Sequence, residues 1–159
     1  MKTFRIVLAV LAVLAILALV LAFSVPVGES AKPEYAYLLV FQNITQWRCK
    51  YLAADLTDVK LKDTTYLVEL LQKYCDDRGV TLLLDDYYGL EEKGYINDDW
   101  NEFEDGLLIT FHDKSLTKNK LVTEASLYCA SLAGQGRKYV VKRTFHEWKI
   151  TSIEMMWIS

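Results

Sequence analysis

The feature that most constrains this chain is an unbroken apolar run from Ile6 to Phe23, which contains no charge, Gly, Pro or amide. A helix of this length spans about 27 Å, close to the hydrocarbon thickness of a bilayer, whereas the apolar part of a signal peptide usually has about 7 to 15 residues. Lys2 and Arg5 precede the run and favour an N-terminus in the cytoplasm. We therefore expect the rest of the chain to cross the membrane and fold outside the cytoplasm.

Two interpretations of residues 1–24 are left open. The length of the apolar run favours a retained single-pass anchor, which would make the chain a membrane protein. The small residues of Ala22-Phe23-Ser24, followed by a plausible mature start at Val25, favour a cleaved signal peptide and a secreted domain. In both cases residues 25–34, rich in Pro, Gly and small polar residues, predict a tether. Residues 35–159 then form a single extracytoplasmic domain, long enough to bury a core.

The charge of the exported part argues against one class of partner. Without Lys2 and Arg5, 16 Lys and Arg remain beside 21 Asp and Glu. Between Asp76 and Asp105 there are eleven carboxylates and two basic residues, which predicts a solvated acidic face. A nucleic-acid surface needs the opposite charge, because it must replace the counterions of the phosphates. The sequence thus predicts no nucleic-acid partner.

The first half of the domain shows helical patterns. Apolar residues recur at helical spacing from Thr65 to Arg78, and Gly79 supplies a stop. Val80–Leu84 is continuously apolar and predicts a buried strand, and a short helix is expected over Tyr87–Lys93. Two further segments fit either a helix or a strand: Tyr35–Phe41 and Trp47–Leu56.

The second half alternates as strands do. Four strands are expected, at Leu107–Phe111, Leu121–Leu132, Tyr139–His146 and Trp148–Ile158. Gly134-Gln135-Gly136 predicts the turn between the second and third strands. Four consecutive strands predict a β-meander.

These elements together predict an α+β fold, in which an N-terminal signal or anchor helix precedes a domain with helices packed on one face of a curved antiparallel sheet. The order helix, strand, helix and four strands resembles that of small cystatin-like or nuclear-transport-factor-like domains. This resemblance lies in element order alone. It implies a fold and no activity, because one fold hosts many functions.

The histidines nominate no catalytic site. His146-Glu147 opens like a zinc-protease motif, but Ile150 stands where the second histidine is required. No Gly-x-Ser-x-Gly elbow nominates a nucleophile, and Gly134-Gln135-Gly136 lacks the rest of a phosphate-binding loop. His112 is expected to be a surface residue at the end of a strand. The sequence thus assigns no catalytic, cofactor-binding or metal-binding residue.

The acidic loop from Asn97 to Gly106 carries enough carboxylates to be considered as a calcium site. An EF-hand loop starting at Asn101 would place Phe103 and His112 where oxygen ligands are needed, so the loop is not an EF-hand. An irregular calcium site and a glycosidase pair at the adjacent Asp85 and Asp86 remain as less favoured alternatives.

Three cysteines, Cys49, Cys75 and Cys129, leave the disulfide state open. An oxidising compartment would pair two of them, and the apolar positions of Cys75 and Cys129 make these two the best pairing. The alternative is that all three are small buried thiols.

Two functions survive. The favoured one is noncatalytic binding of a protein, peptide or envelope ligand, for which the aromatic residues around the acidic loop offer either a recognition patch or additional core. These are Tyr87, Tyr88, Tyr95, Trp100 and Phe103. The alternative is a small secreted hydrolase. A cleft that brought His112 or His146 together with a carboxylate and a Ser or Cys would favour the hydrolase.

Overall fold

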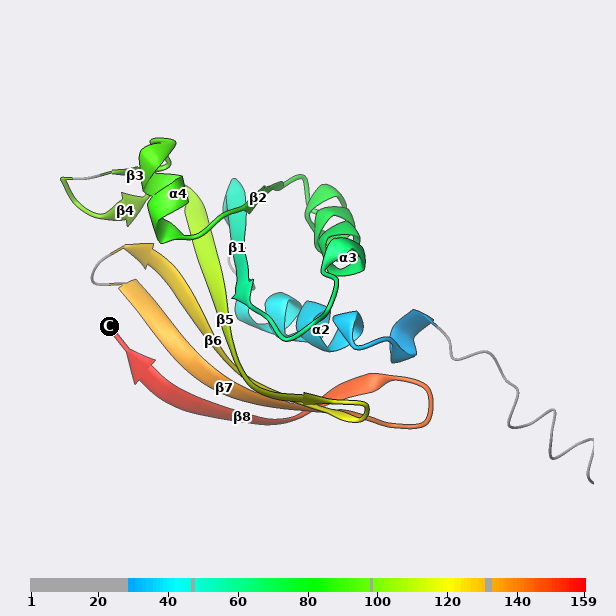
Figure 1. The fold of residues 1–159 in the computed structure, drawn as a ribbon. Helices are drawn as coiled ribbons and strands as arrows, with labels where there is room; N and C mark the ends of the chain where they lie inside the picture. Colours follow the sequence, from blue (N-terminus) through cyan, green and yellow to red (C-terminus); the bar gives the residue numbers. More distant parts are fainter. Residues whose placement is uncertain (1–28, 47, 98, 131–132) are drawn as a thin grey trace, which may run out of the picture.

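The computed structural model describes residues 29–46, 48–97, 99–130 and 133–159, so the expected signal or anchor segment lies outside the described residues. The domain is a mixed α+β fold built on a curved, open sheet of eight strands (Figure 1). Its elements are η1 (Glu29–Ala31), α2 (Glu34–Ile44), β1 (Tyr51–Asp58), α3 (Thr65–Asp76), β2 (Thr81–Leu84), α4 (Tyr87–Glu92), β3 (Ile96–Asn97), β4 (Glu102–Phe103), β5 (Gly106–Thr117), β6 (Lys120–Ala130), β7 (Ala133–Arg143) and β8 (Trp148–Ile158). No helix within these described ranges is long and apolar enough to cross a membrane.

The sheet is mixed, which corrects the expectation of a purely antiparallel one. Six strands follow the order β2-β1-β5-β6-β7-β8, and the β3–β4 hairpin joins the end of β6 through Glu102 and Ala130. β1 is parallel to both β2 and β5. The parallel pairing of β1 and β2 arises because α3 connects them, and a helical crossover returns the chain in the same direction. Strands β5 to β8 form the expected antiparallel meander.

The helical predictions are largely confirmed. α3 and α4 lie where the periodicity placed them, and α3 is followed by Gly79 with a φ of 67°. This left-handed conformation suits glycine, which has no Cβ to clash. The two undecided segments become a helix and a strand: α2 covers Tyr35–Phe41, and β1 begins at Tyr51.

The predicted glycine turn is wrong. Gly134 and Gly136 lie inside β7, and the connection from β6 falls at residues 131–132, outside the described residues. The glycine at position 136 has a packing reason, since a Cβ there would overlap the indole ring of Trp157 on the neighbouring strand. The glycine therefore lets an aromatic ring lie flat on the sheet, a use that glycine also has within strands.

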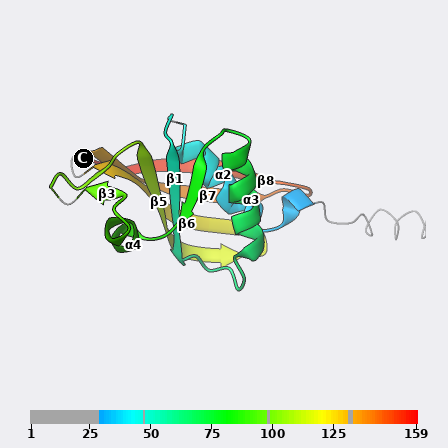
Figure 2. The ribbon, with the colours of Figure 1, turned by 90° about the horizontal axis from the view of Figure 1, so that it is seen from above.

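Helices cover both faces of the sheet, whereas one face was expected. The larger core lies on the concave face beneath α2 and α3, and includes Phe41 and Phe111. A second core packs α4 and the β3–β4 hairpin against the opposite, convex face, through Leu90 and Leu108. Figure 2 shows α3 and α4 on opposite sides of β1 and β5. The predicted buried strand Val80–Leu84 is instead the short edge strand β2, with Leu84 exposed.

Candidate functional site at the exposed edge strand

The candidate site is centred on β8, the long edge strand that pairs with β7 alone among the described strands. Its first residue is anchored: Trp148 is buried, and its Nε1 donates a hydrogen bond to the carbonyl oxygen of Ala31 at 3.1 Å. Beyond it the strand is open, with large apolar side chains between 45% and 72% exposed. These are Ile153, Met155, Met156, Trp157 and Ile158.

The apolar side chains of β8 project on both faces of the sheet. Ile153 lies opposite the buried Tyr139, which places it on the concave face. Trp157 lies opposite Gly136 on the convex face. This arrangement arises because the register between β7 and β8 shifts twice, between Gly136 and Arg137 and between Val140 and Val141. Each bulge adds a residue and changes which face the following side chains occupy.

A groove of ≈ 320 Å³ borders β8 on the concave face. Its lining is mostly apolar and includes Leu127, Cys129, Gln135 and Ile158. Gln135 and Ile158 are direct neighbours on β7 and β8, and Leu127 follows on β6. The amide oxygen of Gln135 accepts a hydrogen bond from Nη2 of Arg137 at 3.0 Å. The groove therefore combines mostly apolar walls with the polar side chain of Gln135, as ligand-binding surfaces commonly do.

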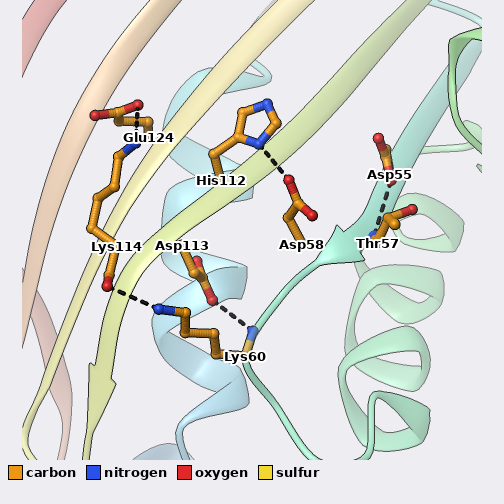
Figure 3. Close-up of polar contacts among 8 residues, drawn as sticks. All are labelled: Asp55, Thr57, Asp58, Lys60, His112, Asp113, Lys114 and Glu124. Carbon is orange, nitrogen blue, oxygen red and sulfur yellow. Dashed lines mark hydrogen bonds and ion pairs between the residues drawn. The ribbon is translucent and has the colours of Figure 1, made fainter.

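A smaller depression of ≈ 140 Å³ lies on the convex face. It is lined by His112, Glu124, Ser126 and Trp157, among others. Nδ1 of His112 lies 2.7 Å from Oδ2 of Asp58 (Figure 3). Glu124 forms an ion pair with Lys114, with 2.8 Å between Nζ and Oε2. His112 was expected at the end of a strand but lies in the middle of β5, because that strand continues to Thr117.

This depression partly meets the condition for a hydrolase. It brings a histidine, a carboxylate and a serine together, and the contact with Asp58 can orient the His112 ring. However, no hydrogen bond joins Ser126 to His112 in the described part of the chain, so a nucleophile–base contact is missing there. The side chains of His112 and Asp58 are both more than half exposed, so their interaction is screened by water.

The second histidine lies elsewhere. His146 is in the connection between β7 and β8, where its carbonyl oxygen accepts a hydrogen bond from Oγ of Ser30 at 3.0 Å. The structure therefore does not bring His112 and His146 into one site.

The adjacent carboxylates Asp85 and Asp86 have structural partners. Asp85 forms an ion pair with Lys93. Asp86 caps α4, because its side chain accepts a hydrogen bond from the backbone N–H of Gly89 at 2.7 Å. These contacts explain both residues without glycosidase chemistry. Among the described residues, no group of three or more His, Cys, Asp or Glu side chains is arranged to hold a metal, and Asp98 of the acidic loop lies outside them.

The aromatic residues around the acidic loop divide between core and surface. Phe103 is buried, and Tyr87 and Tyr95 are partly buried in the second core. Tyr88 and Trp100 are both more than 70% exposed. Three of the five aromatic residues thus contribute to a core, and the other two lie on the surface around the acidic loop.

All three cysteines are free, so the Cys75–Cys129 bridge is not formed. Cys75 is buried on α3, and burial raises the pKa of its thiol to about 11. The nearby Cys49 raises that pKa further. Cys129 lies near the end of β6, where its Sγ donates a hydrogen bond to the carbonyl oxygen of Ala133 at 3.0 Å. The apolar pattern correctly placed Cys75 inside but could not show that its cysteine neighbour is Cys49.

Comparisons with protein-family models, with curated proteins and with solved structures find no match.

The sequence predicts the strand Trp148–Ile158 but not its position at an open edge of the sheet. One signal was present: Met155 to Ile158 are four consecutive apolar residues, and a strand with one solvated face should alternate. Such a run predicts apolar side chains on both faces. Its position at the end of the meander leaves no later strand of the described chain to cover it.

Proposed function

We propose that this chain is an extracytoplasmic, noncatalytic binding domain that captures an extended protein segment along β8. Residues 1–24 either anchor the domain in the membrane, with the N-terminus in the cytoplasm, or are cleaved to release a secreted protein. The single observation that carries the proposal is the open edge of β8, with exposed apolar side chains on both faces of the sheet.

An unpaired strand edge presents a row of free N–H and C=O groups, which can hydrogen-bond to an added strand. Alternate side chains of that added strand would point to the two faces. On one face they would meet Trp157, and on the other Ile153 and the apolar groove. The backbone would supply affinity and the two faces would supply specificity. We also propose, from element order alone, that the fold is related to that of cystatin-like or nuclear-transport-factor-like domains.

The test is a selection of peptides displayed on phage, with 12 random residues, against the full chain in detergent micelles. We expect enrichment of sequences with alternating apolar residues, and loss of their binding in the variant Ile153→Lys. A matched control is Leu84→Lys, which places the same charge at the other edge of the sheet at nearly the same exposure. Binding that survives Ile153→Lys, or that is lost equally in Leu84→Lys, would contradict the proposal.

A second candidate function is a small secreted hydrolase, favoured by the Asp58–His112 contact beside Ser126. In that case His112 would act as a general base for the serine hydroxyl. The test is turnover of a panel of chromogenic esters by the full chain, compared with His112→Gln and Ser126→Ala. Hydrolysis that both substitutions abolish would support the hydrolase, and equal background rates in all three proteins would remove it.

A further inference from the structure

We infer that the segment captured by β8 is the β8 strand of a second copy of this chain, so that two domains join edge to edge about a two-fold axis. This inference rests on the proposed function, because it names the partner of the same edge. An isologous contact needs a self-complementary surface, in which each residue meets a suitable residue of the other copy. The sequence of β8 can be tested for this property.

One antiparallel register makes β8 complementary to itself. In this register Thr151 of one copy faces Ser152 of the other at the two-fold axis. Each step along one strand is then matched by a step in the opposite direction along the other. Lys149 then faces Glu154, twice by symmetry, and Ile150 faces Ile153. Directly opposed residues of an antiparallel pair must lie on the same face of the sheet. Both of these pairs satisfy this requirement.

The face assignments come from the pairing with β7. Lys149 lies opposite Lys142, and Glu154 lies opposite Lys138, two β7 residues an even number apart. They therefore share the convex face. Ile150 and Ile153 lie opposite Val141 and Tyr139, whose side chains are buried on the concave face. The bulge at Thr151 is the reason that Lys149 and Glu154 share a face. Without the extra residue, these two side chains would point to opposite faces of the sheet.

An exposed aromatic ring also lies just before the start of β8. Phe145 is 87% exposed in the connection that precedes the strand. Ile158, at the far end of β8, is also strongly exposed, and an antiparallel second copy brings this end close to the connection that holds Phe145. Of the nine large apolar side chains exposed in the described residues, six lie between Phe145 and Ile158, and the pairing would bring them to one interface. Burial of such side chains is the main favourable contribution to association.

Charge complementarity selects a second copy over an unrelated strand. β8 carries Lys149 near its start and Glu154 just past its middle, so an antiparallel copy in this register brings opposite charges together at both sites. Lys149 already contacts Glu147 at 2.8 Å, but both side chains are more than half exposed and the lysine can exchange partners at little cost. A two-fold axis normal to the sheet also places α2 of both copies on the same face.

The test is sedimentation velocity of the full chain in detergent micelles, with charge-reversed variants. The apolar N-terminal segment can itself associate in micelles, so the test compares variants that share this segment. Lys149→Glu and Glu154→Lys each place like charges across the interface at both pairs. We expect each variant alone to dimerise about tenfold more weakly than the natural chain.

Mixing the two variants should restore the dimer, because each acidic position then faces a basic one. The doubly reversed chain, Lys149→Glu with Glu154→Lys, should also recover. Lys142→Glu is the matched control, since Lys142 lies beside Lys149 on the same face but on β7, one strand in from the edge. It should leave dimerisation unchanged.

The exposed ring of Phe145 gives an independent test of the antiparallel arrangement. Phe145→Ser should weaken the dimer about tenfold and leave the unfolding temperature unchanged, because the ring is solvated in the single copy. Tyr88→Ser, which removes another strongly exposed ring far from β8 in the sequence, should have no effect on either quantity.

The outcomes separate the inference from the proposed function. A natural chain that stays monomeric at about 100 μM, or a dimer that tolerates both charge reversals, would overturn the pairing of two copies. Peptide selection on β8 would then still decide whether the edge binds another protein. Loss of the dimer in each single variant, with recovery in the mixture, would support both.

Discussion

The two edges of the sheet are built in different ways. At one edge, β2 has four residues, and α3 and α4 lie next to it in the chain on opposite faces of the sheet. At the other edge, β8 has eleven residues, and its last eight are all exposed. Short, covered strands are the usual means by which proteins prevent unwanted pairing at an edge. β2 is short and has helices beside it, whereas β8 is long and mostly exposed, so β8 is the better template for an added strand.

The difference also runs along β8 itself. Its first residue, Trp148, is buried against η1, whereas Trp157 near its end rests on the surface over Gly136. The beginning of the strand thus contributes to the stability of the domain, and its end offers apolar surface to a partner. Substitutions at the two ends should separate stability from association.

The largest effect is expected at the buried end. Trp148→Ala removes a buried aromatic ring and its hydrogen bond, so we expect the free energy of unfolding to fall by about 3–5 kcal/mol. Trp157→Ala removes a half-exposed ring and should cost about 1 kcal/mol or less. Urea denaturation followed by circular dichroism measures both. Equal losses would contradict the division of β8 into an anchored and an open end.

The next effect compares the two edges in association. Ile153→Lys places a charge in the middle of the open edge, a device that natural proteins use against edge pairing, and we expect at least a tenfold rise in the dimer dissociation constant. Leu84→Lys, at the short edge strand β2, should leave that constant unchanged. Sedimentation velocity at several concentrations gives both values. A larger effect from Leu84→Lys would reverse the roles assigned to the two edges.

Thiol reactivity distinguishes the core beneath α3, where Cys75 is buried, from the groove beside β8, which Cys129 lines. Cys75 is buried and its raised pKa of about 11 leaves almost no thiolate at pH 8, since a group stays protonated below its pKa. Cys129 lines the groove beside Ile158. Iodoacetamide at pH 8, followed by peptide mass spectrometry, should modify Cys129 well before Cys75. Rapid labelling of Cys75 would show that the core beneath α2 is open.

The smallest effect is expected on the convex face. Asp58→Asn removes one partner of a solvated contact with His112, so the free energy of unfolding should change by about 0.5 kcal/mol or less. The same urea titration measures it. A loss above about 2 kcal/mol would mean that the Asp58–His112 pair is structurally important, and would strengthen the case for a built site there.

The sequence predicted the elements whose patterns are local. The spacing of Leu67, Leu71 and Cys75 defined α3, and alternation defined the strands of the meander. It failed where long-range packing decides. Gly134 and Gly136 have the composition of a turn, but the Trp157 ring requires glycine at position 136 within a strand. The parallel pairs of β1 depend on a crossover that no local pattern specifies.

The candidate site was harder to predict than the fold. His112 and Asp58 are 54 residues apart in the chain, so their contact could not be found from spacing. The apolar residues of β8 were visible, but their exposure depends on which strand lies at the edge. The order of the strands depends on which strands pair across the whole sheet, and local sequence patterns do not specify this pairing.

The most direct test of the central claim is hydrogen exchange of the full chain in micelles, measured by mass spectrometry at low and high protein concentration. If β8 pairs with a second copy, the amides of residues 149–158 exchange more slowly at high concentration, while those of β2 exchange at the same rate at both. Exchange in β8 that does not change with concentration, in a sample that spans about 1 to 100 μM, would contradict the account.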